Sequence, residues 1–177
     1  MAGTRAVNAV AVALLVGLTL SGCSGDDPVP KVEPSSPAPT PTSGSPSPSQ
    51  QALSPEETVR AWVKARNEAL QDGNVASVQA LSERSCRTCH NSIAPIESVY
   101  GDGGHFETRG WLVVASRPLS TAGGSATVDA ALQYLSGRTF PSAGATPVSY
   151  DVERHIARFR LHKVDGHWLI SFIGFLS

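Results

Sequence analysis

The stretch SPEETVRAWVKARNEALQDGN, residues 54–74, predicts a long amphipathic helix that turns one face toward the core. Ser54 suits the N-cap, Pro55 suits the first helical position, and Glu57 completes a capping box. Gly73 can end the helix because glycine tolerates the left-handed conformation that closes many helices. The residues of the core-facing stripe recur at steps of three and four, and they are Val59, Trp62, Val63, Arg66, Ala69 and Leu70.

Helical patterns continue after this stretch. A short helix is predicted over residues 75–81, and a third helical segment over residues 86–100. The side chains that share one stripe of the third segment are Cys86, Cys89, Ile93, Ile96 and Tyr100. Pro95 lacks an N–H group and crowds the preceding turn, so we expect a kink or a restarted helix there. Both cysteines are therefore expected to face the core.

Beyond Gly104 the sequence alternates between apolar and polar residues, which is typical of strands. One strand is predicted within HFETRGWLVVASRPL, residues 105–119, and another within SATVDAALQYLSG, residues 125–137. The side chains that the second strand places on one face are Val128, Ala130, Leu132 and Tyr134. Residues 149–176 indicate a long hairpin whose turn is Asp165–Gly166.

The first strand of this hairpin has an apolar face and a basic face. Ala157, Phe159 and Leu161 lie on one face, opposite Arg158, Arg160 and His162. The final strand, which follows Gly166, is apolar on both faces, so we expect it to be central in the sheet and covered. Helices followed by antiparallel strands predict an α+β fold.

The N-terminus indicates an export signal over residues 1–22, with Arg5 followed by an apolar stretch over residues 9–20. The tetrapeptide LSGC, residues 20–23, resembles the bacterial lipobox. That resemblance implies cleavage before Cys23 and attachment of a diacylglyceryl group to its thiol, with palmitate among the acyl chains of the mature anchor. An ordinary secretory signal with an incidental cysteine is the alternative. We expect a protein anchored by lipid to the extracytoplasmic side of the cell membrane.

Residues 23–51 change in composition to Pro, Ser, Thr and Gly, as in PSSPAPTPTSGSPSPSQQ at residues 34–51. Such a segment has almost nothing apolar to bury, so we predict a disordered linker. The folded domain is then residues 52–177, which is long enough for a single core.

The string SCRTCH, residues 85–90, permits several chemistries. A c-type haem would use Cys86, Cys89 and His90, but the only methionine is Met1, which leaves with the signal. A structural zinc site needs four ligands, usually supplied as two spaced pairs, and this sequence has only one such pair. A thiol-disulfide oxidoreductase places Cys-x-x-Cys after a strand, whereas helices precede it here. We favour a structural Cys86–Cys89 disulfide in an oxidising compartment, with haem and redox chemistry as alternatives.

Other candidate residues give weaker signals. Asp129 and His155 are the only strand-borne acid–base candidates, and no acid–base pair stands out, so no catalytic residue and no metal site is predicted. A basic strip along the hairpin comprises Arg154, Arg158, Arg160, His162 and Lys163. These side chains would either be solvated or contact anionic lipids or cell-wall polymers. The aromatic residues that would line a cavity for a small apolar ligand are Trp62, Trp111, Tyr134, Trp168 and Phe172.

The order of the predicted elements resembles that of the nuclear-transport-factor-2-like (SnoaL-like, cystatin-like) superfamily. The helical residues 54–82 open the domain, and the strand-forming sequence HKVDGHWLISFI closes it. The resemblance implies a cone in which a strongly bent antiparallel sheet of about four strands wraps a long helix. LSERSCRTCHNSIAPIESVYGDGGHFE, residues 81–107, is similar to a family of uncharacterised lipoproteins of high-GC Gram-positive bacteria. In that family the two cysteines belong to the motif and a histidine at position 90 does not. The resemblance implies no established activity.

These observations favour a membrane-anchored binding or interaction module over an enzyme. The formal net charge of −1 gives no reason to expect nucleic acid as a partner. A cell-envelope protein or a small apolar molecule is the expected partner, and no cofactor is predicted.

Overall fold

The computed structural model describes residues 52–176. The predicted signal peptide, the lipidation of Cys23 and the predicted linker all lie outside the described residues. No helix of the described part is both long and apolar enough to cross a membrane.

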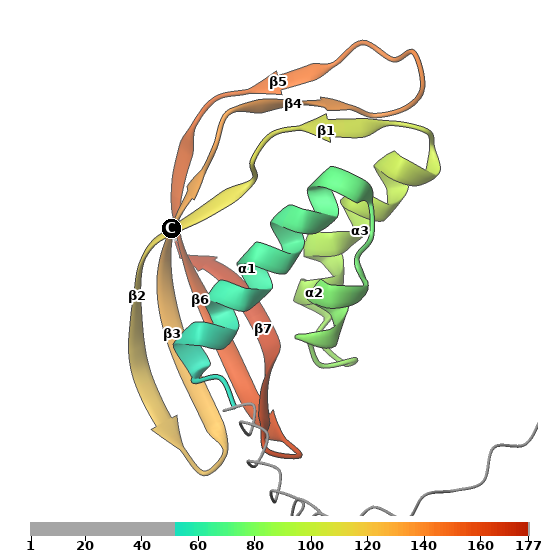
Figure 1. Cartoon of the computed structure of the whole chain (residues 1–177). Coiled ribbons are helices and arrows are strands. Elements are labelled where there is room, and N and C mark those ends of the chain that lie inside the picture. Colours follow the sequence, from blue (N-terminus) through green and yellow to red (C-terminus); the bar gives the residue numbers. More distant parts are fainter. Residues whose placement is uncertain (1–51, 177) are drawn as a thin grey trace, which may run out of the picture. The chain divides into compact units, whose positions relative to one another are not determined.

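Three helices precede seven strands. The helices are α1 (Pro55–Asp72), α2 (Ala76–Ala80) and α3 (Arg87–Gly101). The strands are β1 (His105–Glu107), β2 (Trp111–Ala122), β3 (Ser125–Tyr134), β4 (Gly137–Phe140), β5 (Val148–Tyr150), β6 (Glu153–Val164) and β7 (His167–Leu176). All strand pairs are antiparallel, in a four-stranded sheet of order β2-β3-β6-β7 and a three-stranded sheet of order β1-β4-β5. The helices lie on the inner side of the curved four-stranded sheet (Figure 1), which confirms the predicted α+β class.

Helix α1 begins and ends where the sequence predicts. The Ser54 hydroxyl accepts a hydrogen bond from the Glu57 N–H at 3.3 Å, and the Glu57 carboxylate accepts one from the Ser54 N–H at 2.8 Å. Gly73 closes the helix with a φ of 76°. A cap of this kind stabilises a helix by about 1 kcal/mol.

The core lies between α1 and the inner face of the four-stranded sheet. From α1 it takes Val59, Trp62 and Val63, and from the sheet it takes Ala126, Val128, Ala130, Leu132, Ala157, Phe159, Leu161 and Ile170. The predicted alternation of β3 and of β6 is therefore confirmed. The Asp165–Gly166 turn is confirmed as well, with φ values of 49° and 86°.

Asp129 lies on the opposite face of β3 from this core, as the alternation predicts. Its carboxylate accepts two hydrogen bonds from Arg158, from Nε at 2.8 Å and from Nη2 at 2.9 Å. The hydrogen bond from Arg158 holds the pKa of the Asp129 carboxyl below its usual range. The folded protein thus stabilises the charged form of the Asp129 carboxyl relative to the unfolded chain.

An Asp129→Asn variant is expected to be slightly less stable than the wild type at neutral pH, because the pair is partly solvated. A lowered folded-state pKa contributes stability that is present above the unfolded pKa of about 4 and is lost as the pH falls through the folded pKa. The difference between variant and wild type should therefore shrink on going from pH 7 to pH 2, as measured by urea unfolding. An equal difference at both pH values would show that the charge pair is not its cause.

The prediction of a single strand over residues 105–119 is wrong. The structure divides it into β1 and β2, which belong to different sheets. Gly110 stands between them with a φ of 78°, a conformation that only glycine adopts without strain. Residues 107–110, Glu-Thr-Arg-Gly, contain no large apolar side chain, and the glycine among them was the available sign of this break.

The central position predicted for the last strand is also wrong, because β7 is an edge strand of its sheet. Near its end, Phe175 and Leu176 are 51% and 42% exposed. The segment that joins α2 to α3 covers part of the outer edge of β7. Ile170 donates its N–H to the Leu81 carbonyl and accepts from the Glu83 N–H, at 2.9 and 2.8 Å, and the Ile173 N–H donates to the Thr88 hydroxyl at 2.9 Å.

Of the two outcomes predicted at Pro95, a kink or a restarted helix, the restart is not found, because α3 continues through Pro95 from Arg87 to Gly101. Proline deprives the carbonyl four residues earlier of its helical donor. Here that carbonyl belongs to Asn91, and both residues are exposed. Water can therefore satisfy the freed carbonyl, which explains why the helix tolerates the proline.

Candidate functional site

The predicted disulfide is present between Cys86 and Cys89. Cys86 caps the N-terminus of α3, where its sulfur accepts a hydrogen bond from the Cys89 N–H at 3.2 Å. The two residues are 1% and 0% exposed and belong to the main core. The bridge therefore fixes the first turn of α3 against the sheet.

This arrangement does not fit the two alternative chemistries of the motif. Haem attachment would need both thiols, which here are bonded to each other, and the His90 Nε2 lies 3.0 Å from the Arg84 carbonyl oxygen. A redox-active pair needs at least one sulfur that a partner thiol can reach. Both sulfur-bearing residues are buried, so the geometry supports a structural role.

A Cys86→Ala, Cys89→Ala double variant is expected to lose about 2 kcal/mol of unfolding free energy, because the four-residue loop no longer restricts the unfolded chain. Chemical unfolding of the oxidised wild type and of the variant measures this difference. A reducing agent under native conditions should leave the wild type intact, since the bridge is buried. Rapid reduction of the folded protein would contradict the buried position of the sulfurs.

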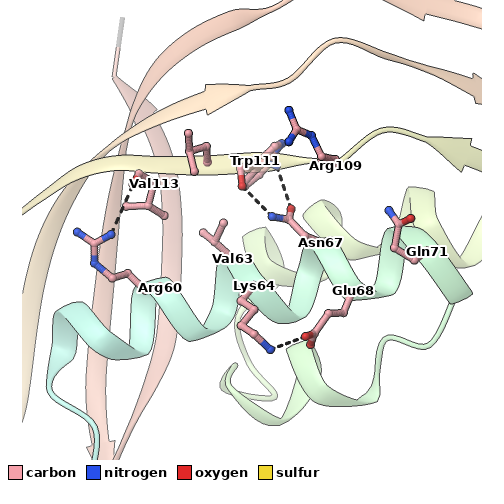
Figure 2. Close-up of a pocket in the computed structure, with 10 residues that line it drawn as sticks. Arg60, Val63, Lys64, Asn67, Glu68, Gln71, Arg109, Trp111 and Val113 are labelled. Atoms are coloured by element: carbon pink, nitrogen blue, oxygen red, sulfur yellow. Dashed lines mark hydrogen bonds and ion pairs between the residues drawn. The ribbon is translucent and has the colours of Figure 1, made fainter.

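A groove of about 460 Å³ runs between α1 and the start of β2 (Figure 2). Asn67 is fixed to the backbone of Trp111, donating from Nδ2 to its carbonyl at 2.7 Å and accepting from its N–H at 2.9 Å. Arg60 donates to the Val113 carbonyl at 3.5 Å. These side chains cover backbone groups on the outer edge of β2.

Further polar side chains of this groove also have partners. Lys64 and Glu68 form an ion pair within α1, and Gln71 donates to the Thr108 carbonyl at 2.8 Å. Arg60 makes a second hydrogen bond to the Ser116 hydroxyl at 3.0 Å. Arg109 also lines the groove (Figure 2), and no hydrogen bond is found for its side chain among the described residues. The other polar side chains are engaged, so the groove mainly joins the helix to the sheet.

A smaller cavity of about 290 Å³ lies where the two sheets meet above α1. We call it the Arg66 cavity, and it is lined by Arg66, Leu70, Phe106, Thr108, Gly110, Trp111, Tyr134, Leu135, Thr139, Tyr150, Asp151 and Glu153. Both sheets and α1 contribute to its wall. Because β1 and β2 diverge at Gly110, the wall contains residues from both sides of that change of direction.

Arg66 is the unusual residue of this wall. Its Nε and Nη1 atoms are buried, and neither has a hydrogen-bond partner among residues 52–176. The guanidinium carbon lies 3.8 Å from the centre of the Trp111 ring, which places the positive charge against an aromatic face. Arg66 takes part in none of the ion pairs found in the described part of the chain.

Burial changes the titration of two groups in the wall. It lowers the pKa of Arg66 to about 10 by disfavouring the charged form. It raises the pKa of Tyr134 to about 12 for the same reason, although the positive charge of Arg66 opposes this shift. At neutral pH the cavity therefore holds a positive guanidinium and a neutral phenol.

An Arg66→Met variant is expected to be more stable than the wild type by about 1 kcal/mol. The change removes a buried charge with two unpartnered nitrogens, which outweighs the loss of the contact with Trp111. Urea unfolding measures the difference, with Arg60→Met as a control that instead loses satisfied hydrogen bonds. A large loss of stability in Arg66→Met would show that the guanidinium has a partner in the folded protein.

The structure brings together only some of the predicted cavity residues. Trp111 and Tyr134 both line the Arg66 cavity, with ring centres 4.5 Å apart and planes 2° from parallel. Trp62 is fully buried in the core, Trp168 lies in a separate hollow near Ser54, and Phe172 lies beside Arg160. Arg66 was not identified as a site residue from the sequence. The available signal was an arginine in the apolar stripe of α1.

The other predicted candidates do not converge. Asp129 pairs with Arg158, whereas His155, three residues before Arg158 on β6, lies 2.9 Å from Glu153. In the basic strip, His162 contacts Glu83 at 2.7 Å, and Arg160 and Lys163 lie over the rings of Phe172 and Trp168. Within residues 52–176 no group of three or more His, Cys, Asp or Glu side chains is placed to hold a metal ion.

Comparison with known proteins shows the fold alone. The sequence matches no protein-family model and no curated protein. Among solved structures, the intermembrane space region of the chloroplast protein ARC6 matches with a TM-score of 0.55 and 17% identity, over 69% of this chain and 93% of that one. At this identity the match shows a shared fold and nothing about function.

Two further matches have NTF2-like and cystatin-like folds. One is an NTF2-like protein of unknown function from Shewanella oneidensis MR-1, with a TM-score of 0.41 and 14% identity over 69% of this chain and 98% of that one. The other is a protein of unknown function with a cystatin-like fold from Nostoc punctiforme PCC 73102, with a TM-score of 0.42 and 8% identity over 70% and 92% of the two chains. Both TM-scores are too low to establish a relationship.

Proposed function

We propose that this chain is a lipid-anchored, extracytoplasmic binding module that takes a small ligand into the Arg66 cavity. The observation that carries the proposal is the half-buried Arg66 guanidinium, which lies in the wall of a cavity of about 290 Å³ and forms no ion pair with any described residue. Ligand sites are typically concave and mostly apolar, with a few placed polar groups. The Arg66 cavity has this composition.

Binding is favoured over catalysis by the protonation of the wall. A general acid or base works best when its pKa lies near the operating pH. Arg66, with a pKa of about 10, and Tyr134, with a pKa of about 12, both keep one protonation state near pH 7. They are suited to holding a ligand in place.

The anchoring part of the proposal is supported by the sequence alone. It rests on the lipobox-like LSGC at residues 20–23 and on the resemblance of residues 81–107 to lipoproteins of high-GC Gram-positive bacteria. On phase separation in a detergent, the chain expressed in such a host should enter the detergent phase, and a Cys23→Ala variant should stay in the aqueous phase. A wild-type chain in the aqueous phase would overturn the anchor and leave the binding function standing.

The binding function is tested by screening a small-fragment library against the detergent-solubilised chain. The library contains acids, amines and neutral molecules, and the signal is the NMR resonance of the Trp111 indole N–H. We expect some fragments to shift this resonance. Thr139→Trp, which places a large side chain in the cavity wall, should abolish these shifts.

Ser149→Trp is the matched control, because Ser149 is exposed on the neighbouring strand of the same sheet and is not part of the cavity wall. It should bind the fragments as the wild type does. Absence of binding by every fragment class, or binding that Thr139→Trp leaves unchanged, would overturn the proposed function.

A further inference from the structure

We infer that the ligand of the Arg66 cavity is a monocarboxylic acid with a flat apolar body. This inference rests on the proposed function and names the chemical class of its ligand. It is carried by the charge of Arg66, by the aromatic wall around it and by the acidic residues at the edge of the cavity.

The first argument is the missing counter-ion. A charge taken out of water is costly unless a partner of opposite sign compensates it. Other partly buried charges of this domain are compensated, as Arg158 is by Asp129. Arg66 has no such partner within residues 52–176, and its Nε and Nη1 atoms make no hydrogen bond there. An anion in the adjoining cavity would supply the missing opposite charge. Because Nε and Nη1 are closed off from solvent, it would bind the remaining nitrogen, Nη2, with a charge-assisted hydrogen bond.

The second argument is the shape of the wall around this charge. The Trp111 and Tyr134 rings are stacked, and Phe106 and Leu70 complete an apolar surface. The stacked faces of these two rings cover each other, and Arg66 lies over the Trp111 ring, so a ligand would meet mainly ring edges. Ring edges favour the face of a flat aromatic partner. The volume of about 290 Å³ matches a compact body rather than a long acyl chain.

The third argument concerns the number of charges on the ligand. Asp151 and Glu153 also belong to the cavity wall, and both residues are exposed. Exposed carboxylates are screened by water and act weakly on a single negative charge at Arg66. They would repel a second negative charge near the edge of the cavity. A dicarboxylate or a phosphate is therefore disfavoured relative to a monocarboxylate.

The experiment uses three probes with the same body and different charge: 3-phenylpropionate, its neutral amide, and 3-phenylpropylamine. Binding to the detergent-solubilised full chain is measured by calorimetry at low ionic strength, with inorganic phosphate as a fourth probe. We expect the acid to bind at least tenfold more tightly than the amide, and phosphate to bind more weakly than the acid. The comparison between acid and amide needs no variant, so it does not depend on the folding of a mutant protein.

Variants then assign the preference to Arg66. Arg66→Met should bind the acid no better than the amide, and Arg66→Lys, which keeps a positive charge, should retain part of the preference. Arg60→Met removes a positive charge six residues earlier on α1, outside the Arg66 cavity, and should leave the preference unchanged.

The outcomes separate this inference from the proposed function. Equal affinity for acid and amide, tighter binding of phosphate, or a preference for the acid that survives in Arg66→Met would overturn the monocarboxylate. Fragments of another class could still bind in a way that Thr139→Trp abolishes, and the binding function would then stand. Absence of every kind of binding would remove both.

Discussion

Replacing Trp62 by alanine is expected to lower the free energy of unfolding by about 4 kcal/mol, because it deletes the largest side chain of the core. Trp62 is 0% exposed and packs against Phe159 and Trp111, with ring centres 6.2 Å away in both cases. Its indole N–H donates to the Ser82 hydroxyl at 2.8 Å. The alanine variant would lose the ring contacts and leave the Ser82 hydroxyl with one partner fewer.

Urea unfolding followed by circular dichroism measures this loss. Since typical domains are stable by about 5 to 15 kcal/mol, the variant loses a large part of its stability and should unfold at a clearly lower urea concentration than the wild type. Trp168→Ala is the matched control, because Trp168 is half-buried and lies outside the central contacts of Trp62. It should cost about 1 kcal/mol or less. Similar losses in the two variants would contradict the central role of Trp62.

A Gly110→Ala variant is expected to lose about 3 kcal/mol, by adding backbone strain to the loss of hydrogen bonds. Gly110 has a φ of 78°, and an added Cβ would overlap the Asn67 side-chain oxygen and lie 2.9 Å from Leu70 Cδ1. Asn67 cannot move away without losing its two hydrogen bonds to the Trp111 backbone. The change would therefore disturb both the covered edge of β2 and the wall of the Arg66 cavity.

Gly123→Ala separates the two causes. Gly123 also has a positive φ, of 56°, but an added Cβ would meet nothing within 4 Å. This control should lose only the conformational part, about 1 kcal/mol, in the same unfolding experiment. If Gly110→Ala lost no more than Gly123→Ala, the close approach of Asn67 would have no energetic importance.

The sequence predicts well where local chemistry and periodicity agree. Ser54 and Glu57 cap α1, Gly73 ends it, and the alternation of β3 correctly separates Val128 from Asp129. The pairing of Cys86 with Cys89 followed from their spacing and the expected compartment, and the structure confirms it. Each of these features depends on residues close together in the chain.

The features that were missed depend on residues far apart. The three-stranded sheet is built from β1, β4 and β5, of three, four and three residues, which are too short to show a periodic pattern. β7 lies at the edge because β3 pairs with β6 and not with β7, and the sequence does not show this choice. The environment of Arg66 is set by Trp111 and by residues of strands β3 to β5. The position of Arg66 in the apolar stripe of α1 could show that the side chain faces inward. It could not show that the guanidinium lacks a partner.

The coverage of the outer strands determines how this domain can associate with other chains. Side chains of α1 occupy backbone groups of β2 at Trp111 and Val113. The segment before α3 occupies those of β7 at Ile170, and Thr88 in the first turn of α3 occupies that of Ile173. A sheet protected in this way does not readily accept an additional strand from a neighbouring polypeptide at these positions. Many copies could thus be crowded together without polymerising through these stretches of backbone.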